Sequence, residues 1–196
     1  MSKANLLDRR QVVGSLLAER KDAIVIGGLG ASTYDIAAAG DHDRNFYLWG
    51  AMGGAVMIGL GVALAQPKLP VVVITGDGEM LMGIGSLATV GLQKPGNLTI
   101  VVLDNEVYGE TGGQASHTGA STDLVGIARC CGIGDSRNLA TMAEIEAFAS
   151  SMHDLGSGPR FASVKIDPAN LERVLSNRDG AFIVNRIRGA LGYRPI

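Results

Sequence analysis

Short apolar runs, each followed by a segment of helical spacing, recur along the chain and constrain its fold most strongly. Val71–Thr75 and Leu98–Leu103 are uncharged and rich in β-branched residues, which predicts strands buried on both faces. Ile24–Ile26, Phe46–Trp49 and Phe161–Ile166 are the other candidate strands. Buried strands that alternate with helices are typical of a parallel sheet. We therefore expect an α/β fold: a doubly wound, mostly parallel sheet with helices on both of its faces.

The segments between these strands have the spacing of amphipathic helices. Thr141 and Glu144 form a capping-box pattern, which predicts a helix that begins at Met142. The expected helices cover Asn5–Arg20, about 53–65, about 79–92, about 122–131 and about 142–152.

The length of 196 residues fits a single domain with an appended tail. We expect a domain over residues 1–167 and a basic tail over residues 168–196 that is helical or docks on a partner. The charged residues of the tail are Arg173, Arg178, Arg186, Arg188 and Arg194 against Glu172 and Asp179. The whole chain has a net charge of -2, which provides no field for holding nucleic acid, so nucleic acid is not an expected partner.

One segment raises the alternative of a membrane span. Phe46–Ala65 is 20 residues long without a charge, and Gly50 and Gly54 form a GxxxG pattern. The segment is rich in glycine and is followed directly by Pro67 and Lys68, which favours a short strand, a turn and a buried helix over one long helix. We expect no membrane association.

Two features indicate the compartment. The first residues, MSKANLLDRRQ, lack the apolar stretch of a secretory signal. Cys130 and Cys131 are neighbours in sequence, which is a poor arrangement for a structural disulfide. We expect a reduced, cytoplasmic protein in which both thiols are buried.

Glycine-rich segments follow four of the predicted strands and hold many of the 28 glycines. The carboxyl ends of parallel strands meet at one edge of a sheet, and glycine lets backbone amides approach an anion closely there. The chain has no GxxxxGK[ST] motif, and the dinucleotide pattern begun by Gly28 and Gly30 has Thr33 at its third glycine position. Neither a P-loop nor a nicotinamide site is favoured. The four segments are GGLGAS, WGAMGG, TGDGE and LDNEVYGETGGQ.

Two of these segments carry candidate metal ligands. Asp77 lies in a GDG motif after one predicted strand, and Asn105 follows the next strand, 28 positions later. Adjacent parallel strands would present the two side chains side by side. A carboxylate oxygen, an amide oxygen and a nearby backbone carbonyl are hard ligands that suit Mg²⁺, whose remaining positions can be filled by diphosphate oxygens and water.

In these motifs the chain resembles the thiamine diphosphate (thiamine pyrophosphate) enzymes, whose diphosphate-binding domain carries GDG and, further along, an asparagine. The resemblance covers Ile24–Ile166 and implies the thiamine diphosphate-binding fold, with thiamine diphosphate and Mg²⁺ as cofactors. It implies Asp77, Asn105 and the carbonyl of Val107 as metal ligands. Met52 falls where the family places the residue that holds the cofactor bent. The implied cofactor-binding residues are Gly30, Ala31, Ser32, Gly50, Met52, Gly53, Gly76, Asp77, Gly78, Glu79, Met80, Asn105, Tyr108 and Gly109.

The resemblance also implies that this chain is half of an enzyme. In the family the activating glutamate belongs to a separate pyrimidine-binding domain, and we expect that domain in an alpha subunit that joins this chain in a hetero- or homo-oligomer. The chain looks most similar to the diphosphate-domain subunit of sulfopyruvate decarboxylase and to the matching half of phosphonopyruvate decarboxylase. That similarity implies a carboxy-lyase that decarboxylates a small 2-oxo acid.

Two alternatives stay open. The TGGQ motif also occurs in 2-oxoacid:acceptor oxidoreductases, whose iron–sulfur cysteine runs are absent here but could lie on a separate subunit. The other alternative is a noncatalytic subunit that keeps the fold. His117, which follows TGGQ, is the candidate catalytic residue for proton transfer to substrate or product.

Overall fold

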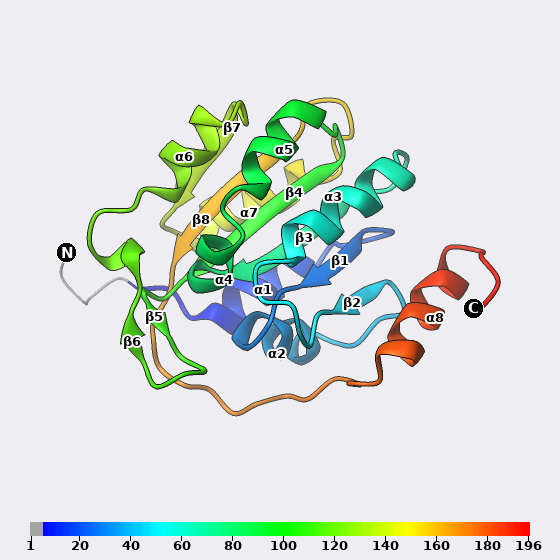
Figure 1. The fold of residues 1–196 in the computed structure, drawn as a ribbon, viewed down its shortest axis with the longest axis horizontal. Coiled ribbons are helices and arrows are strands. Elements are labelled where there is room, and N and C mark those ends of the chain that lie inside the picture. The colour runs from blue at the N-terminus through cyan, green and yellow to red at the C-terminus, as the bar shows by residue number, and fades with distance from the viewer. Residues whose placement is uncertain (1–5) are drawn as a thin grey trace.

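The computed structural model describes residues 6–196 and has a central sheet of six parallel strands (Figure 1). The strand order is β2-β1-β3-β4-β8-β7. A separate hairpin of β5 (Val107–Tyr108) and β6 (Gln114–Ala115) lies beyond β4. The predicted parallel α/β sheet is confirmed. The strands of the sheet are β1 (Ile24–Gly27), β2 (Asn45–Tyr47), β3 (Val71–Gly76), β4 (Leu98–Asp104), β7 (Asp135–Leu139) and β8 (Arg160–Lys165).

Helices cover both faces of this sheet. One hydrophobic cluster packs α1, α2 and α7 against one face, and a second cluster packs α3, α4, α5 and α6 against the other. Both clusters are apolar because the central strands present buried side chains on each face. The helices are α1 (Arg9–Leu17), α2 (Ala31–Ala38), α3 (Ala55–Ala65), α4 (Asp77–Met82), α5 (Ser86–Gln93), α6 (Leu124–Cys130), α7 (Met142–Ser151) and α8 (Gly180–Ala190).

The strand order places a switch point between β1 and β3. From β1 the chain moves outward through α2 to β2, and it then returns through α3 to β3 on the other side of β1. The loops that leave the carboxyl ends of β1 and β3 therefore diverge to opposite faces of the sheet. A crevice opens between such loops, and open α/β sheets bind their ligands there.

Two elements differ from the sequence prediction near this crevice. The helix expected over about 79–92 is divided into α4 and α5. The division falls at Gly83, whose backbone packs directly against the backbone of Gly53. A Cβ atom at Gly83 would lie 2.2 Å from the carbonyl oxygen of Gly53. The first helix begins at Arg9, because the side chain of Asp8 caps it by accepting from the amide of Gln11. The predicted start at Asn5 lies outside the described residues.

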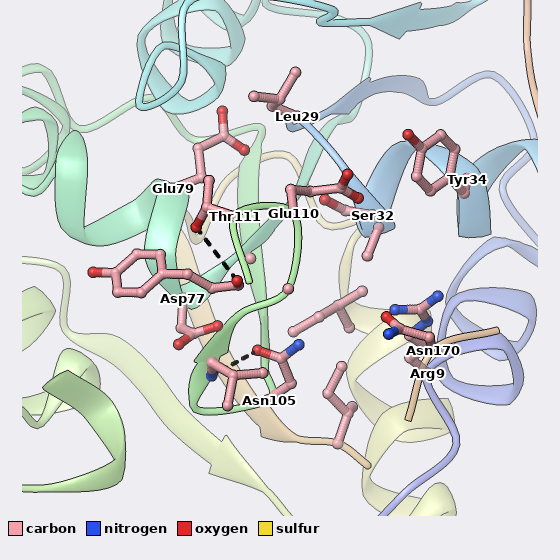
Figure 2. Close-up of a pocket in the computed structure, with 18 of the residues that line it drawn as sticks. Arg9, Leu29, Ser32, Tyr34, Asp77, Glu79, Asn105, Glu110, Thr111 and Asn170 are labelled. Carbon is pink, nitrogen blue, oxygen red and sulfur yellow. Dashed lines mark hydrogen bonds between the residues drawn. The ribbon is translucent and has the colours of Figure 1, made fainter. Parts of the chain in front are cut away.

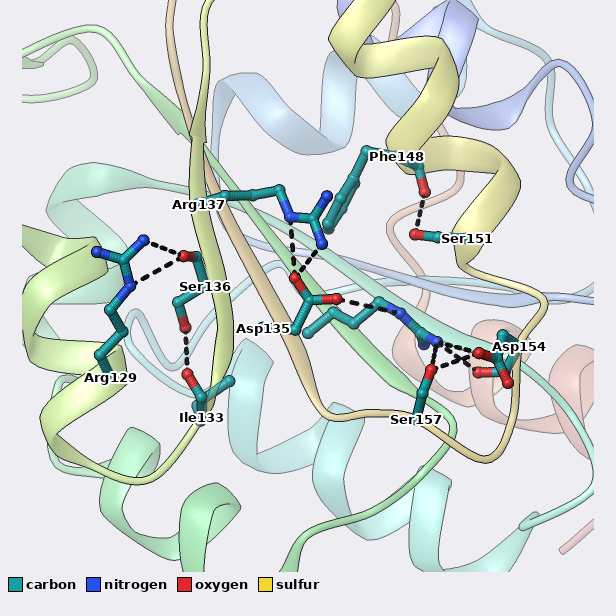
Figure 3. Close-up of polar contacts among 10 residues, drawn as sticks. Arg129, Ile133, Asp135, Ser136, Arg137, Phe148, Ser151, Asp154 and Ser157 are labelled. Atoms are coloured by element: carbon teal, nitrogen blue, oxygen red, sulfur yellow. Dashed lines mark hydrogen bonds and ion pairs between the residues drawn. The ribbon is translucent and has the colours of Figure 1, made fainter.

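The edge strand β7 was not predicted, because its sequence DSRNL is polar. It pairs with β8 and is held by charged side chains (Figure 3). Arg160 of β8 is 1% exposed and forms ion pairs with Asp135 at 3.6 Å and Asp154 at 3.4 Å. Arg129 donates to the carbonyl oxygen of Ser136. Polar tertiary contacts, rather than an apolar pattern, place this strand.

The uncharged segment over residues 46–65 forms the end of β2, a glycine turn and α3. The helix α3 is 11 residues long and packs against β3. Across residues 6–196, no helix has both the length and the apolar character needed to cross a membrane.

The expectation of two buried thiols is wrong. Both cysteines are free, but Cys130 is exposed and Cys131 is half-buried. The reason is that α6 ends at Cys130, beyond the part of the helix that packs against the sheet.

The C-terminal segment packs against the rest of the chain. An extended strap over residues 167–179 runs along the bottom edge of Figure 1 and leads to α8. Trp49 Nε1 donates to the carbonyl oxygen of Asn177 at 2.9 Å, and Arg186 Nη1 lies 2.6 Å from Asp41 Oδ2. Ile183 of α8 is 1% exposed within the main hydrophobic cluster. The predicted helical tail is therefore helical over α8, while the boundary at residue 167 stays a prediction.

We expect Ile183→Ala to lower the free energy of unfolding by about 2–4 kcal/mol, because the change leaves a cavity in the core. Urea denaturation measures this. Phe182→Ala is the matched control, because the neighbouring Phe182 is 46% exposed, and it should cost less than about 1 kcal/mol. Equal effects of the two changes would contradict the docking of α8.

Candidate active site

A cavity of about 360 Å³ opens at the carboxyl ends of β1, β3 and β4 (Figure 2). Its walls come from the β1–α2 loop, the GDG turn, the loop after β4, the start of α1 and the C-terminal strap. These segments are separated from one another in the sequence, and the fold around the switch point brings them together. The lining residues include Arg9, Leu29, Ala31, Ser32, Tyr34, Met52, Gly76, Asp77, Gly78, Glu79, Asn105, Val107, Tyr108, Gly109, Glu110, Asn170, Leu171 and Arg173.

Asp77 is the buried carboxylate of this cavity. It follows β3, begins α4 and is 2% exposed. Ser116 and Thr118 donate hydrogen bonds to Oδ2, the latter at 3.1 Å. Burial raises the pKa of Asp77, the two hydroxyls oppose that rise, and the nearby charge of Asp104 adds to it. A carboxylate held in this way at a cavity wall favours a cation as its partner.

Asn105 follows β4 and faces the same cavity as Asp77. Its Oδ1 accepts a hydrogen bond from the amide of Val107 at 3.1 Å, as Figure 2 shows. This Asx-type turn directs the chain so that Val107 also lines the cavity. The three residues expected to bind a metal are thus brought to one place, but their metal-binding role stays a prediction.

The three candidate metal ligands include only one charged group, the carboxylate of Asp77. Within residues 6–196 there is no group of three or more His, Cys, Asp or Glu side chains that could hold a metal ion. One carboxylate with an amide oxygen and a carbonyl oxygen is the kind of incomplete hard-ligand set that suits Mg²⁺ when a ligand's phosphate oxygens complete the shell. The residues present therefore fit Mg²⁺ with a diphosphate.

Glu79 holds the surrounding loops together. It is 3% exposed, and Thr75 Oγ1 donates to its Oε2 at 2.6 Å. Burial raises the pKa of Glu79, opposed by Thr75 and by the backbone amides of Gly53, Ala55 and Leu29. Position 28, which faces Glu79, requires glycine, because a Cβ atom there would lie 1.8 Å from Glu79 Oε2.

The N-terminus of α2 opens onto the cavity. Gly30 caps the helix at φ +85° without a side-chain hydrogen bond, and Ala31 and Ser32 of the first turn line the cavity. The first amides of a helix carry partial positive charge and favour anions. Opposite them, the ring of Tyr108 packs so closely on Gly78 that a Cβ atom there would lie 2.5 Å from it.

Most predicted cofactor-binding residues line the cavity, but some lie elsewhere. Met80 is buried in the hydrophobic core, and Gly53 packs its backbone against Gly83. Gly30 and Gly50 are not part of the lining, although Gly30 directly precedes it. His117 is exposed at the start of the 3-10 turn His117–Gly119, while its neighbours Ser116 and Thr118 contact Asp77. The functional roles of all these residues stay predictions.

Sequence reasoning missed the cavity residues contributed by α1 and the strap. Burial raises the pKa of Asp35 on α2 to about 6, against the lowering effect of its two arginine partners, Arg9 and Arg10. Arg173 of the strap lies 3.2 Å from Glu110 and over the ring of Tyr34. Arg9 and Arg173 lie outside the glycine-rich motifs, so no local pattern marked them.

Comparison with known proteins agrees with this geometry. Residues 27–162 match the model of the family described as thiamine pyrophosphate enzyme, C-terminal TPP binding domain. The chain is similar in structure to a benzoylformate decarboxylase from Polynucleobacter necessarius, with a TM-score of 0.71 and 20% sequence identity over 86% of this chain and 34% of that one. The structural likeness shows the shared fold.

Two curated relatives differ in length. The chain is 42% identical to a phosphonopyruvate decarboxylase from Streptomyces viridochromogenes over 80% of this chain and 39% of that protein. It is 35% identical to sulfopyruvate decarboxylase subunit beta from Methanothermobacter thermautotrophicus over 94% of this chain and 98% of that subunit. The chain thus spans well under half of the first relative and nearly all of the second.

Proposed function

Because the chain belongs to the thiamine pyrophosphate enzyme family, we propose that it is the diphosphate-binding subunit of a Mg²⁺-dependent 2-oxo acid decarboxylase. The observation that carries the proposal is the convergence of Asp77, Asn105 and Val107 on a cavity that also receives the start of α2. The relatives named sulfopyruvate and phosphonopyruvate decarboxylase support the reaction class and a substrate that is a pyruvate with an anionic group on carbon 3.

The residues of the cavity divide into two binding roles under this proposal. Asp77, Asn105 and the carbonyl of Val107 would hold Mg²⁺, and the first amides of α2 with Ser32 would hold a phosphate group. Met52 supports the apolar part of the cofactor from the wall of the cavity. When bound, thiamine diphosphate supplies the electron sink for loss of CO₂ from a 2-oxo acid. The protein contributes binding, orientation and exclusion of water.

The proposal includes a partner that carries the pyrimidine-binding domain. The relative of nearly equal length is named as subunit beta, which supports an alpha subunit as the partner of this chain. The cavity is then one wall of a site completed at a subunit interface, and it lies in the cytoplasm with its soluble substrate. His117 stays the proposed proton-transfer residue, because it lies between Ser116 and Thr118, which both contact Asp77, and its own side chain is exposed.

Calorimetry and CO₂ release test the proposal together. The chain should bind thiamine diphosphate only in the presence of Mg²⁺, and CO₂ release from sulfopyruvate or phosphonopyruvate should need a co-expressed pyrimidine-domain subunit. Full activity of the isolated chain would contradict the partner. Failure of the chain to bind the cofactor even in complex with the pyrimidine-domain subunit would favour a noncatalytic subunit. Reduction of an artificial electron acceptor in place of simple decarboxylation would favour the oxidoreductase alternative.

A further inference from the structure

Arg9 is a buried cation whose Nε has no hydrogen-bond partner among residues 6–196. The residue is 6% exposed, and its Nε lies 3.1 Å from Asp35 Oδ2. The two groups are within ion-pair distance but poorly aligned, so that neither Arg9 Nε nor Asp35 Oδ2 has a hydrogen-bond partner among residues 6–196. A buried donor without an aligned acceptor, such as this Nε, costs free energy.

The guanidinium belongs to a cavity wall. Arg9 lines the main cavity and also a neighbouring cavity of about 200 Å³ that it shares with Asp167 and Leu171. In the view of Figure 2, Arg9 and Asn170 lie on the opposite side of the main cavity from Asp77. The metal-binding candidates and Arg9 therefore mark two different ends of the same space.

Two arginines share one buried carboxylate beside the main cavity. Arg10 also contacts Asp35, with its Nε 3.3 Å from Oδ1, so two guanidinium groups share one carboxylate. Glu110, another carboxylate of the lining, is paired with Arg173. The other carboxylates beside Arg9, those of Asp8 and Asp167, line the neighbouring cavity rather than the main one.

The helix α2 links Arg9 to the amides at the cavity. Asp35 lies in the second turn of α2, about one helical turn from the first-turn residues Ala31 and Ser32. Arg9 lines the same cavity as the first turn of α2, and both a guanidinium and the first amides of a helix attract anions. A planar guanidinium and diverging backbone amides together match the several acceptor oxygens of a tetrahedral oxyanion.

We propose that Arg9 binds an oxyanion group, a phosphate, phosphonate or sulfonate, of the ligand in the main cavity. The identity of that ligand rests on the proposed function. The group is either the terminal phosphate of thiamine diphosphate or the anionic substituent of the 2-oxo acid, and both present the same chemistry to Arg9.

Calorimetry on the full chain with three probes distinguishes these sources. The probes are inorganic pyrophosphate, thiamine diphosphate with Mg²⁺, and 3-phosphonopropanoate as an unreactive mimic of the substrate. Arg9→Gln should weaken at least one of them by at least tenfold. Weaker binding of pyrophosphate and thiamine diphosphate assigns Arg9 to the cofactor, whereas weaker binding of 3-phosphonopropanoate alone assigns it to the substrate.

Arg10→Gln is the matched control, because Arg10 also contacts Asp35 but does not line the cavity. It should leave the binding of all three probes within about twofold of the wild type. Arg9→Lys keeps the charge and should recover part of the affinity. Arg9→Gln combined with Asp35→Asn removes both members of the buried pair, and it gives the same comparison if Arg9→Gln alone unfolds.

Three results would overturn the inference: wild-type affinity of Arg9→Gln for every probe, equal losses in Arg9→Gln and Arg10→Gln, or no binding of any probe by the wild type. The proposed function fails separately. If the wild type binds pyrophosphate through Arg9 but does not bind thiamine diphosphate, the oxyanion site stands and the cofactor assignment is wrong.

Discussion

Replacement of Asp77 by alanine is expected to lower the affinity for thiamine diphosphate in the presence of Mg²⁺ at least 100-fold. Asp77 is the single carboxylate in the proposed ligand set, so its loss removes the charged ligand and leaves only neutral oxygens from Asn105 and Val107. A 100-fold loss corresponds to about 2.8 kcal/mol of binding free energy. Isothermal titration calorimetry at a fixed Mg²⁺ concentration measures it.

Two variants make this result specific. Asp22→Ala removes an exposed carboxylate far from the cavity and should not change the affinity. Ser116→Ala removes one hydroxyl that orients Asp77 and should weaken binding less than Asp77→Ala does. If Asp77→Ala binds the cofactor as tightly as the wild type, with unchanged dependence on Mg²⁺, the metal assignment is wrong.

Replacement of Gly91 by alanine is expected to lower the free energy of unfolding by about 3 kcal/mol or more. Gly91 lies inside α5, and a Cβ atom there would lie 1.7 Å from the carbonyl oxygen of Cys131, just after α6. The opposing atom belongs to the backbone, so no side-chain rotation relieves the overlap, and α5 and α6 must separate. For a chain of this size the loss corresponds to a midpoint of thermal unfolding roughly 6–12 °C lower.

Gly61→Ala is the matched control for this prediction. Gly61 also lies inside a helix, α3, but no atom outside its own chain neighbourhood lies within 4 Å of a Cβ atom built there. Alanine should therefore raise stability by about 0.5–1 kcal/mol through its higher helix propensity. A stabilising effect of Gly91→Ala, like that of Gly61→Ala, would contradict the packing of α5 on α6.

The strands of the sheet could be predicted to different degrees. The strands Val71–Gly76 and Leu98–Asp104 could be predicted, as Val71–Thr75 and Leu98–Leu103, because a central parallel strand is buried on both faces and is apolar. The edge strand Asp135–Leu139 could not be predicted because one side of an edge strand faces solvent, so its sequence is polar. Ion pairs such as that between Arg160 and Asp135 stabilise it instead. Its position is a property of tertiary contacts rather than of local sequence.

The residues of the site could also be predicted only in part. Asp77 and Asn105 could be placed together from the sequence, because each follows a predicted strand and parallel strands end at one edge. His117 illustrates the limit of such placement: it follows the same glycine-rich loop, yet its side chain is exposed while Ser116 and Thr118 contact Asp77. Neighbouring side chains in a turn point in different directions, and the direction of each one cannot be predicted from the loop sequence.

By itself, the sequence determined the parallel α/β fold, the edge of the sheet where glycine-rich loops meet and the family to which those loops belong. Apolar periodicity and the spacing of GDG and Asn105 contain that information because they depend on neighbours along the chain. The tertiary structure alone decided that α1 and the C-terminal strap complete the cavity with Arg9 and Arg173. These residues reach the site through packing against α2 and the loop after β4, and long-range packing leaves no periodic signal in the sequence.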